Sequence, residues 1–83
     1  PNPFNPLTTI SYELLTDGII NIIIYDLTGR KIKTLISGFH TVGTKNVNWN
    51  ATNNKGQPVS AGVYIYSVEA GQFRKTKKMI LLK

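Results

Sequence analysis

The chain has 83 residues, no cysteine, and a formal net charge of +6 from ten Lys/Arg against four Asp/Glu. This length fits one small domain over residues 1–83, and the absence of cysteine excludes disulfides and thiolate metal sites. No apolar run approaches the roughly 20 residues that a transmembrane helix needs, so we expect no transmembrane segment. An initiating Met is also missing, and we expect a module of a longer protein that carries its own export signal.

The first six residues form a leader rich in proline and asparagine. Prolines fix the backbone angle φ, remove amide donors and disfavour helix for the residue that precedes each of them. We therefore expect a stiff segment that ends an upstream linker and fixes the first strand onto the domain, with its phenylalanine as a single apolar plug. The leader reads Pro1, Asn2, Pro3, Phe4, Asn5 and Pro6.

Alternation of apolar and polar side chains recurs along the chain, while helical periodicity is almost absent. The clearest case is the segment 19–25, where Ile20, Ile22 and Ile24 share one face. Turn-forming residues separate segments of this kind about every ten residues, which is typical of an antiparallel β-sandwich. We predict an all-β sandwich of six or seven short strands. The expected strands cover residues 9–14, 19–25, 31–36, 40–50, 64–68 and 73–82.

Two details of the middle of the chain follow from the same pattern. Ser37-Gly38 is expected to close the third strand, because glycine and serine are common in turns. In the next segment Val47 and Trp49 are expected to point inward. The stretch 50–62 is rich in Asn, Gly, Pro and Ser, so we expect it to be the longest loop.

The sequence offers no residues for catalysis. His40 is the only histidine, and no serine lies in a signature of an activated nucleophile. Turns explain Asp17 and Asp26, and the loop 50–56 offers amides but no carboxylate to a calcium ion. We expect neither an enzyme nor a metal or cofactor site.

The basic residues gather in two clusters, which could attract nucleic acid, anionic lipid or acidic glycan. No aromatic residues alternate with the lysines, as a stacking platform for single strands would require, so we expect no nucleic-acid partner. The alternative is a solvated sheet face that keeps a small domain soluble. The clusters are Arg30, Lys31 and Lys33, then Arg74, Lys75, Lys77 and Lys78.

The last strand lacks the alternation of the others. Its apolar run lies between lysines, and a strand has this pattern when it is buried on both sides or when its outer face meets a partner. Three alternatives could cover the apolar residues of this strand. They could be covered by linked domains or by a cap of the sandwich. A receptor could pair one of its own strands with this strand and bind its lysines, or the strand could pair with a neighbouring copy. The residues concerned are Lys77, Lys78, Met79, Ile80, Leu81, Leu82 and Lys83.

Three signals in their order and spacing resemble a known family: the leader 1–6, the stretch Gly62-Val63-Tyr64-Ile65-Tyr66, and the terminal run 78–83. The chain is similar over essentially its whole length to the type A carboxy-terminal sorting domains of type IX secretion cargo. It is equally similar to the immunoglobulin-like module of flagellar hook-capping proteins. The resemblance implies an immunoglobulin-like sandwich in which Trp49, Gly62, Tyr64 and Tyr66 belong to the signature of the fold.

For function, the resemblance implies a non-catalytic sorting and anchoring module of a larger protein. In the family, such domains direct cargo from the periplasm through an outer-membrane translocon to the cell surface or the medium. A sortase-like peptidase commonly removes the domain and links the cargo to lipopolysaccharide. The expected recognition element is 77–83, and the other expected partner is the upstream part of the parent chain.

Two other functions stay open. The chain could be a permanent structural module that spaces domains or assembles into a homo-oligomer through its edge strand, as a filament subunit or hook scaffold does. It could also be an accessory domain that binds a surface or a carbohydrate. In that case Trp49 and the tyrosines would stack on sugars.

Overall fold

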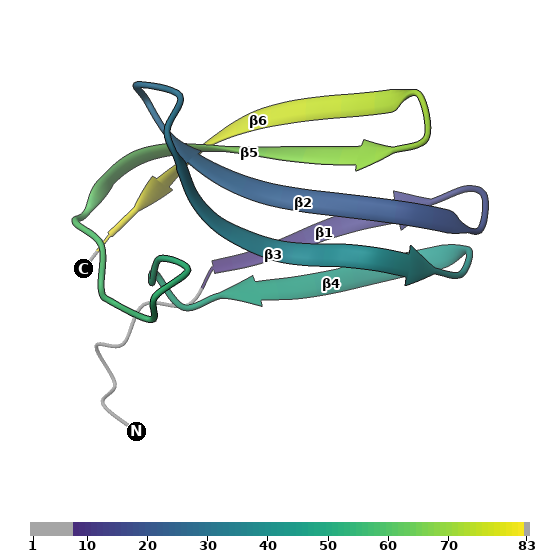
Figure 1. The fold of residues 1–83 in the computed structure, drawn as a ribbon, viewed down its shortest axis with the longest axis horizontal. Coiled ribbons are helices and arrows are strands. Elements are labelled where there is room, and N and C mark those ends of the chain that lie inside the picture. The colour runs from purple at the N-terminus through teal and green to yellow at the C-terminus, as the bar shows by residue number, and fades with distance from the viewer. Residues whose placement is uncertain (1–7, 83) are drawn as a thin grey trace.

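The computed structural model describes residues 8–82, which form two antiparallel β-sheets packed face to face (Figure 1). One sheet has the strand order β3-β2-β5-β6 and the other pairs β1 with β4. The all-β sandwich predicted from the sequence is confirmed, with six strands in the described residues. No helix in residues 8–82 is long and apolar enough to cross a membrane. The strands are β1 (Thr8–Leu14), β2 (Gly18–Asp26), β3 (Lys31–His40), β4 (Gly43–Trp49), β5 (Gly62–Ala70) and β6 (Phe73–Leu81).

The core lies between the two sheets, where alternate residues of each strand meet. Ile20, Ile22 and Ile24 of the central strand β2 are fully buried, as their alternation predicts. They divide between two adjoining clusters. Ile24 packs with Trp49 and other residues near the chain termini, and Ile20 and Ile22 pack near the opposite end.

Trp49 and Tyr64 join the two sheets at the end near the termini. Their rings meet edge to face, with centroids 5.2 Å apart. Each polar atom is bonded, since Trp49 Nε1 donates to the carbonyl oxygen of Thr52 at 2.8 Å and the Tyr64 hydroxyl donates to that of Ser60 at 2.6 Å. The two aromatic residues therefore pack the two sheets against each other and fix both ends of the 50–61 loop by hydrogen bonds.

Strand β3 is longer than predicted. Ser37 and Gly38 do not close it; they pair with β2 and the strand continues to His40. The turn lies at 41–42, and β4 begins only at Gly43. The prediction was wrong because continuous pairing with β2 outweighs the local turn preference of Ser-Gly. The register of this pair shifts beside Ile22 and again beside Ile24, so β3 also bulges along its length.

The 50–61 loop, the longest connection in residues 8–82, folds back onto β3. The Asn54 amide donates to the Ile32 carbonyl, and Asn54 Oδ1 accepts from the Thr34 amide, both at 3.0 Å. Asn53 Oδ1 accepts from two amides of its own loop, those of Lys55 and Gln57. These contacts cover part of the outer edge of β3, which would otherwise be open to pairing with another strand.

Candidate functional site

Strand β6 is the uncovered edge of the four-stranded sheet. It pairs with β5 alone, from Gly62 opposite Leu81 to Ala70 opposite Phe73. Figure 1 shows it as the outermost strand, on the side of the sheet remote from β3. Because the 50–61 loop contacts the β3 edge, β6 offers the longer free row of backbone donors and acceptors in this sheet.

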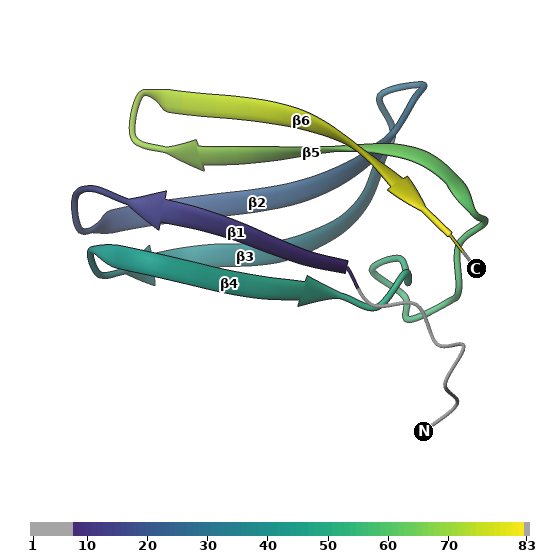
Figure 2. The same cartoon turned by 180° about the vertical axis from the view of Figure 1, so that it is seen from behind.

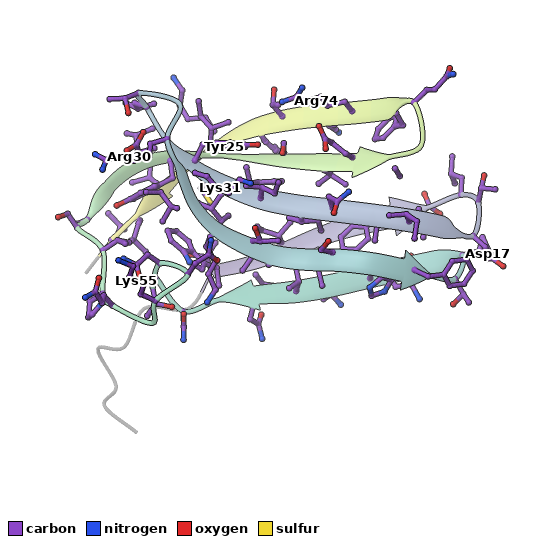
Figure 3. All side chains as sticks on the ribbon, viewed as in Figure 1. Asp17, Tyr25, Arg30, Lys31, Lys55 and Arg74 are labelled. Atoms are coloured by element: carbon purple, nitrogen blue, oxygen red, sulfur yellow. The ribbon has the colours of Figure 1, made fainter. Side chains whose placement is uncertain are left out.

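Basic side chains project from both faces of β6. Lys75 and Lys77 lie opposite Val68 and Tyr66 and share their inward-facing side, whereas Lys78 points outward. All three lysines are exposed. Arg74, labelled in Figure 3, pairs with Glu69 of β5 at 3.3 Å. The lysines have no such ion pair with any residue in 8–82, so the strand presents unneutralised positive charge.

The apolar end of β6 is divided between the core and the surface. Leu81 is 2% exposed and packs in the core, and Met79 is half-buried against it. Ile80 and Leu82 are 64% and 77% exposed. The interpretation of a strand buried on both sides is therefore wrong within residues 8–82, because at this end of β6 only the inward-facing residues are covered. Two apolar side chains remain beside the lysines for a partner to contact.

Part of the expected recognition element lies outside the described residues. Lys83 is not among them, and neither is the Pro/Asn-rich leader 1–6. Lys77, Lys78, Met79, Ile80, Leu81 and Leu82 lie together on β6 or directly after it. Trp49, Gly62, Tyr64 and Tyr66 lie in the sandwich itself, with Gly62 opening β5 at the terminal end.

The carboxylates and the single histidine are dispersed over residues 8–82. No three groups among His, Asp and Glu in residues 8–82 come together as metal ligands would. Asp17 and Asp26 serve turns, as expected: Asp17 Oδ1 accepts from the Val42 amide at 2.7 Å. Trp49 is 1% exposed and Tyr64 is 7% exposed, so the stacking of sugars on these two rings is excluded by burial.

Asp26 closes the turn between β2 and β3. Its Oδ1 accepts from the Thr28 hydroxyl and from the amides of Thr28 and Arg30, and Oδ2 lies 3.6 Å from the Arg30 guanidinium. Figure 3 labels Arg30 at this corner. The Thr28 hydroxyl is the largest cause that lowers the pKa of Asp26, followed by the bond from the Arg30 amide. The carboxylate form therefore stabilises this turn.

We expect the contribution of Asp26 to stability to be present at neutral pH and lost in acid. Because the folded pKa is lowered, the contribution is complete above the unfolded value of about 3.9 and disappears as the pH falls through the folded value. Urea unfolding of the wild type and of Asp26→Asn at pH 7 and at pH 2 measures this. The difference between the two proteins should shrink in acid. A difference that is equal at both pH values would contradict the role of the charge.

One feature of the surface was not predicted. A cleft of about 650 Å³ lies between the β1–β2 turn and the β5–β6 hairpin, and Leu15, Ile19 and Phe73 form part of its wall. These side chains are 78%, 59% and 59% exposed. Sequence reasoning missed the cleft because it joins segments far apart in the chain. The one hint in the sequence is the presence of large apolar residues in or beside turns.

Comparison with known proteins places the fold. The family model of the FlgD Ig-like domain matches residues 15–72, which end directly before β6. No curated protein matches the sequence significantly. Several solved structures are similar, and the chain spans less than two thirds of each of the three described below.

The three structures differ in how much of them the chain covers. FlgD from P. aeruginosa has a TM-score of 0.70 and 18% identity, over 90% of this chain and 59% of that one. FlgD from Xanthomonas campestris, described as a hook-capping protein essential for flagellar assembly, has a TM-score of 0.71 and 19% identity, over 93% and 56%. Dimeric latent PorU from Porphyromonas gingivalis has a TM-score of 0.67 and 25% identity, over 96% of this chain and 8% of that one.

Proposed function

The chain belongs to the FlgD Ig-like domain family, and from this premise we propose that it is a non-catalytic sorting and anchoring module of a larger exported bacterial protein. The type IX secretion machinery would recognise it through β6. One observation carries the proposal: the free edge strand of the larger sheet combines exposed lysines with exposed apolar side chains, Ile80 and Leu82. A strand of this kind can be bound without any chemistry in the module itself.

Two further observations favour the type IX context over the flagellar one. The terminal run of apolar residues between lysines matches the sorting signature that the sequence resembles, and it lies outside the part matched by the FlgD family model. The likeness to PorU has an identity of 25% over 96% of the chain, against 18% and 19% for the two FlgD structures. The FlgD likeness alone supports the fold and leaves the function open.

The mechanism we propose is recognition without turnover. A receptor strand pairs with the backbone of β6, and acidic groups of the receptor meet Lys77 and Lys78 on its two faces. The cargo then passes from the periplasm through the outer-membrane translocon to the cell surface or the medium. A sortase-like peptidase removes the module and attaches the cargo to the surface.

A permanent structural module is the second candidate, and the FlgD family membership favours it. In this case the domain would space its neighbours or assemble through an edge. Direct pairing of β6 with β6 of a second copy is disfavoured, because it would bring Lys75, Lys77 and Lys78 of two chains together. A structural role would therefore use contacts with other domains of the parent protein.

Mass spectrometry of the mature parent protein separates the two candidates. The protein is recovered from cells and from culture medium, and peptides from residues 64–83 are quantified against upstream peptides. A removed sorting module predicts that these peptides are depleted at the surface and in the medium but present inside the cell. Stoichiometric peptides in all fractions would contradict removal and support the permanent module.

A further inference from the structure

The smaller sheet also has a free edge, on β1. Within residues 8–82, β1 pairs only with β4, so the backbone groups on its other side meet no strand. Figure 2, which views the molecule from the β1–β4 side, shows that β5 and β6 stand clear of the two-stranded sheet next to this edge. The sandwich is therefore open along one side, and an open edge of this kind can accept an extended segment.

The floor of this open side is the inward face of β5 and β6. Val68 of β5 is buried beneath β1, but the side chains of β6 that pair with this part of β5 are not covered by β1. Phe73 is 59% exposed at the hairpin end, and Lys75 and Lys77 follow on the same face. Nearer the termini Met79 is half-buried and Leu81 closes the core. The floor is thus apolar at the hairpin end and basic in its middle.

The cleft of about 650 Å³ forms the hairpin end of this open side. Leu14, the last residue of β1, and Ala70 and Phe73 of the β5–β6 hairpin all line it. A segment that pairs with β1 along its whole length would therefore reach the cleft. Its volume is sufficient to hold an apolar side chain.

The charges of the floor indicate the chemistry of the guest. The two ion pairs of residues 8–82 are Arg74 with Glu69 and Arg30 with Asp26. Lys75 and Lys77 take part in neither ion pair. They are separated by a single residue and therefore lie on the same face of β6. Two neighbouring unpaired cations beside a free strand edge call for two carboxylates on alternate residues of the guest.

We propose that an extended acidic segment of a partner protein adds to the free edge of β1 as the third strand of the smaller sheet and covers the inward face of β6. Side chains of a strand alternate, so every second residue of the guest faces the floor. The position beside Leu14 takes an apolar residue into the cleft. The positions beside Tyr12 and Ile10 take carboxylates that reach Lys75 and Lys77.

The guest is not a second copy of this chain. The four carboxylates of the sequence are Glu13, Asp17, Asp26 and Glu69, and no two of them are separated by a single residue. A strand from another copy would therefore leave at least one lysine of the pair unneutralised. The proposal does not rest on the proposed function, because it concerns the edge of β1 and a partner of any source.

The test is binding of a defined peptide to the 83-residue chain, followed by ¹⁵N NMR. The probe is the peptide Thr-Leu-Thr-Glu-Thr-Glu-Thr. A second peptide with the reversed sequence is also tested, because the guest strand can run in either direction along β1. Amide shifts should concentrate in β1 and in residues 73–79, and exchange of β1 amides should slow. A peptide with glutamines in place of the glutamates should bind at least about tenfold more weakly.

Two double variants separate this site from general charge. Lys75→Glu with Lys77→Glu should weaken binding at least about tenfold, and a peptide with lysines in place of its glutamates should restore it. The matched control, Lys31→Glu with Lys55→Glu, makes the same change of net charge at exposed positions near the β3 side. Its affinity for the peptide should stay within about threefold of the wild-type affinity.

Four results would overturn the proposal. They are no binding of either peptide direction at millimolar concentration, equal binding of the glutamine peptide, amide shifts that omit β1, and a dimer whose β1 amides are already protected without peptide. Sedimentation of the free chain detects the last of these. None of the four bears on export, which is measured separately in cells.

Discussion

Replacing Trp49 with alanine should destabilise the protein more than any substitution of an exposed residue. Trp49 is 1% exposed, packs edge to face on Tyr64, and donates its indole N–H to the Thr52 carbonyl. Truncation of a buried aromatic residue typically costs about 3–5 kcal/mol. A domain of this size has roughly 4–12 kcal/mol in total, so the variant should lose about a quarter of its stability or more.

Urea denaturation followed by circular dichroism measures this loss. The matched control is Phe39→Ala, which removes an aromatic ring that is 64% exposed and should change the stability by less than about 0.5 kcal/mol. Trp49→Phe keeps much of the packing and loses the indole bond, so its loss should lie between the two. A cost below about 1 kcal/mol for Trp49→Ala would mean that the core does not depend on this contact between the sheets.

The second large effect separates folding from recognition within β6. Leu81→Ala should cost about 2–5 kcal/mol, because Leu81 packs in the core with Ile10 and Trp49. Ile80→Ala, its neighbour, should cost less than about 0.5 kcal/mol because 64% of Ile80 is exposed. The same urea experiment measures both free energies of unfolding.

This pair of variants makes the recognition strand testable without loss of the fold. If Ile80→Ala is as destabilising as Leu81→Ala, the outward face of β6 is covered by the domain itself. In that case the exposed apolar patch on which the proposed docking depends does not exist.

The sequence predicted the strands well where apolar residues alternate. Ile20, Ile22 and Ile24 face the core because the two-residue period of a strand leaves no other arrangement for a half-buried sheet. It failed at Ser37-Gly38, where pairing with β2 carries the strand through a sequence that would form a turn in isolation. Contacts between distant segments decide such cases, and a local pattern does not contain them.

The candidate site was only partly predictable for the same reason. The unusual composition of β6 was visible in the sequence, but a run of consecutive apolar residues does not show which alternate residues face the core. Leu81 is covered and Ile80 is not. The cover of the β3 edge by Asn54, and the open side beside β1, likewise arise from the placement of the loop and the smaller sheet.

The most direct test of recognition through β6 is export of a reporter fused to residues 1–83 in a host with type IX secretion. The wild-type fusion is compared with Lys77→Ala/Lys78→Ala and with the matched control Lys31→Ala/Lys55→Ala, after urea denaturation has shown equal stability. Removing two charged contacts at a recognition strand typically weakens binding by about tenfold or more. We predict that export falls by at least about tenfold for the β6 variant alone, whereas equal export of all three fusions would contradict the proposed function.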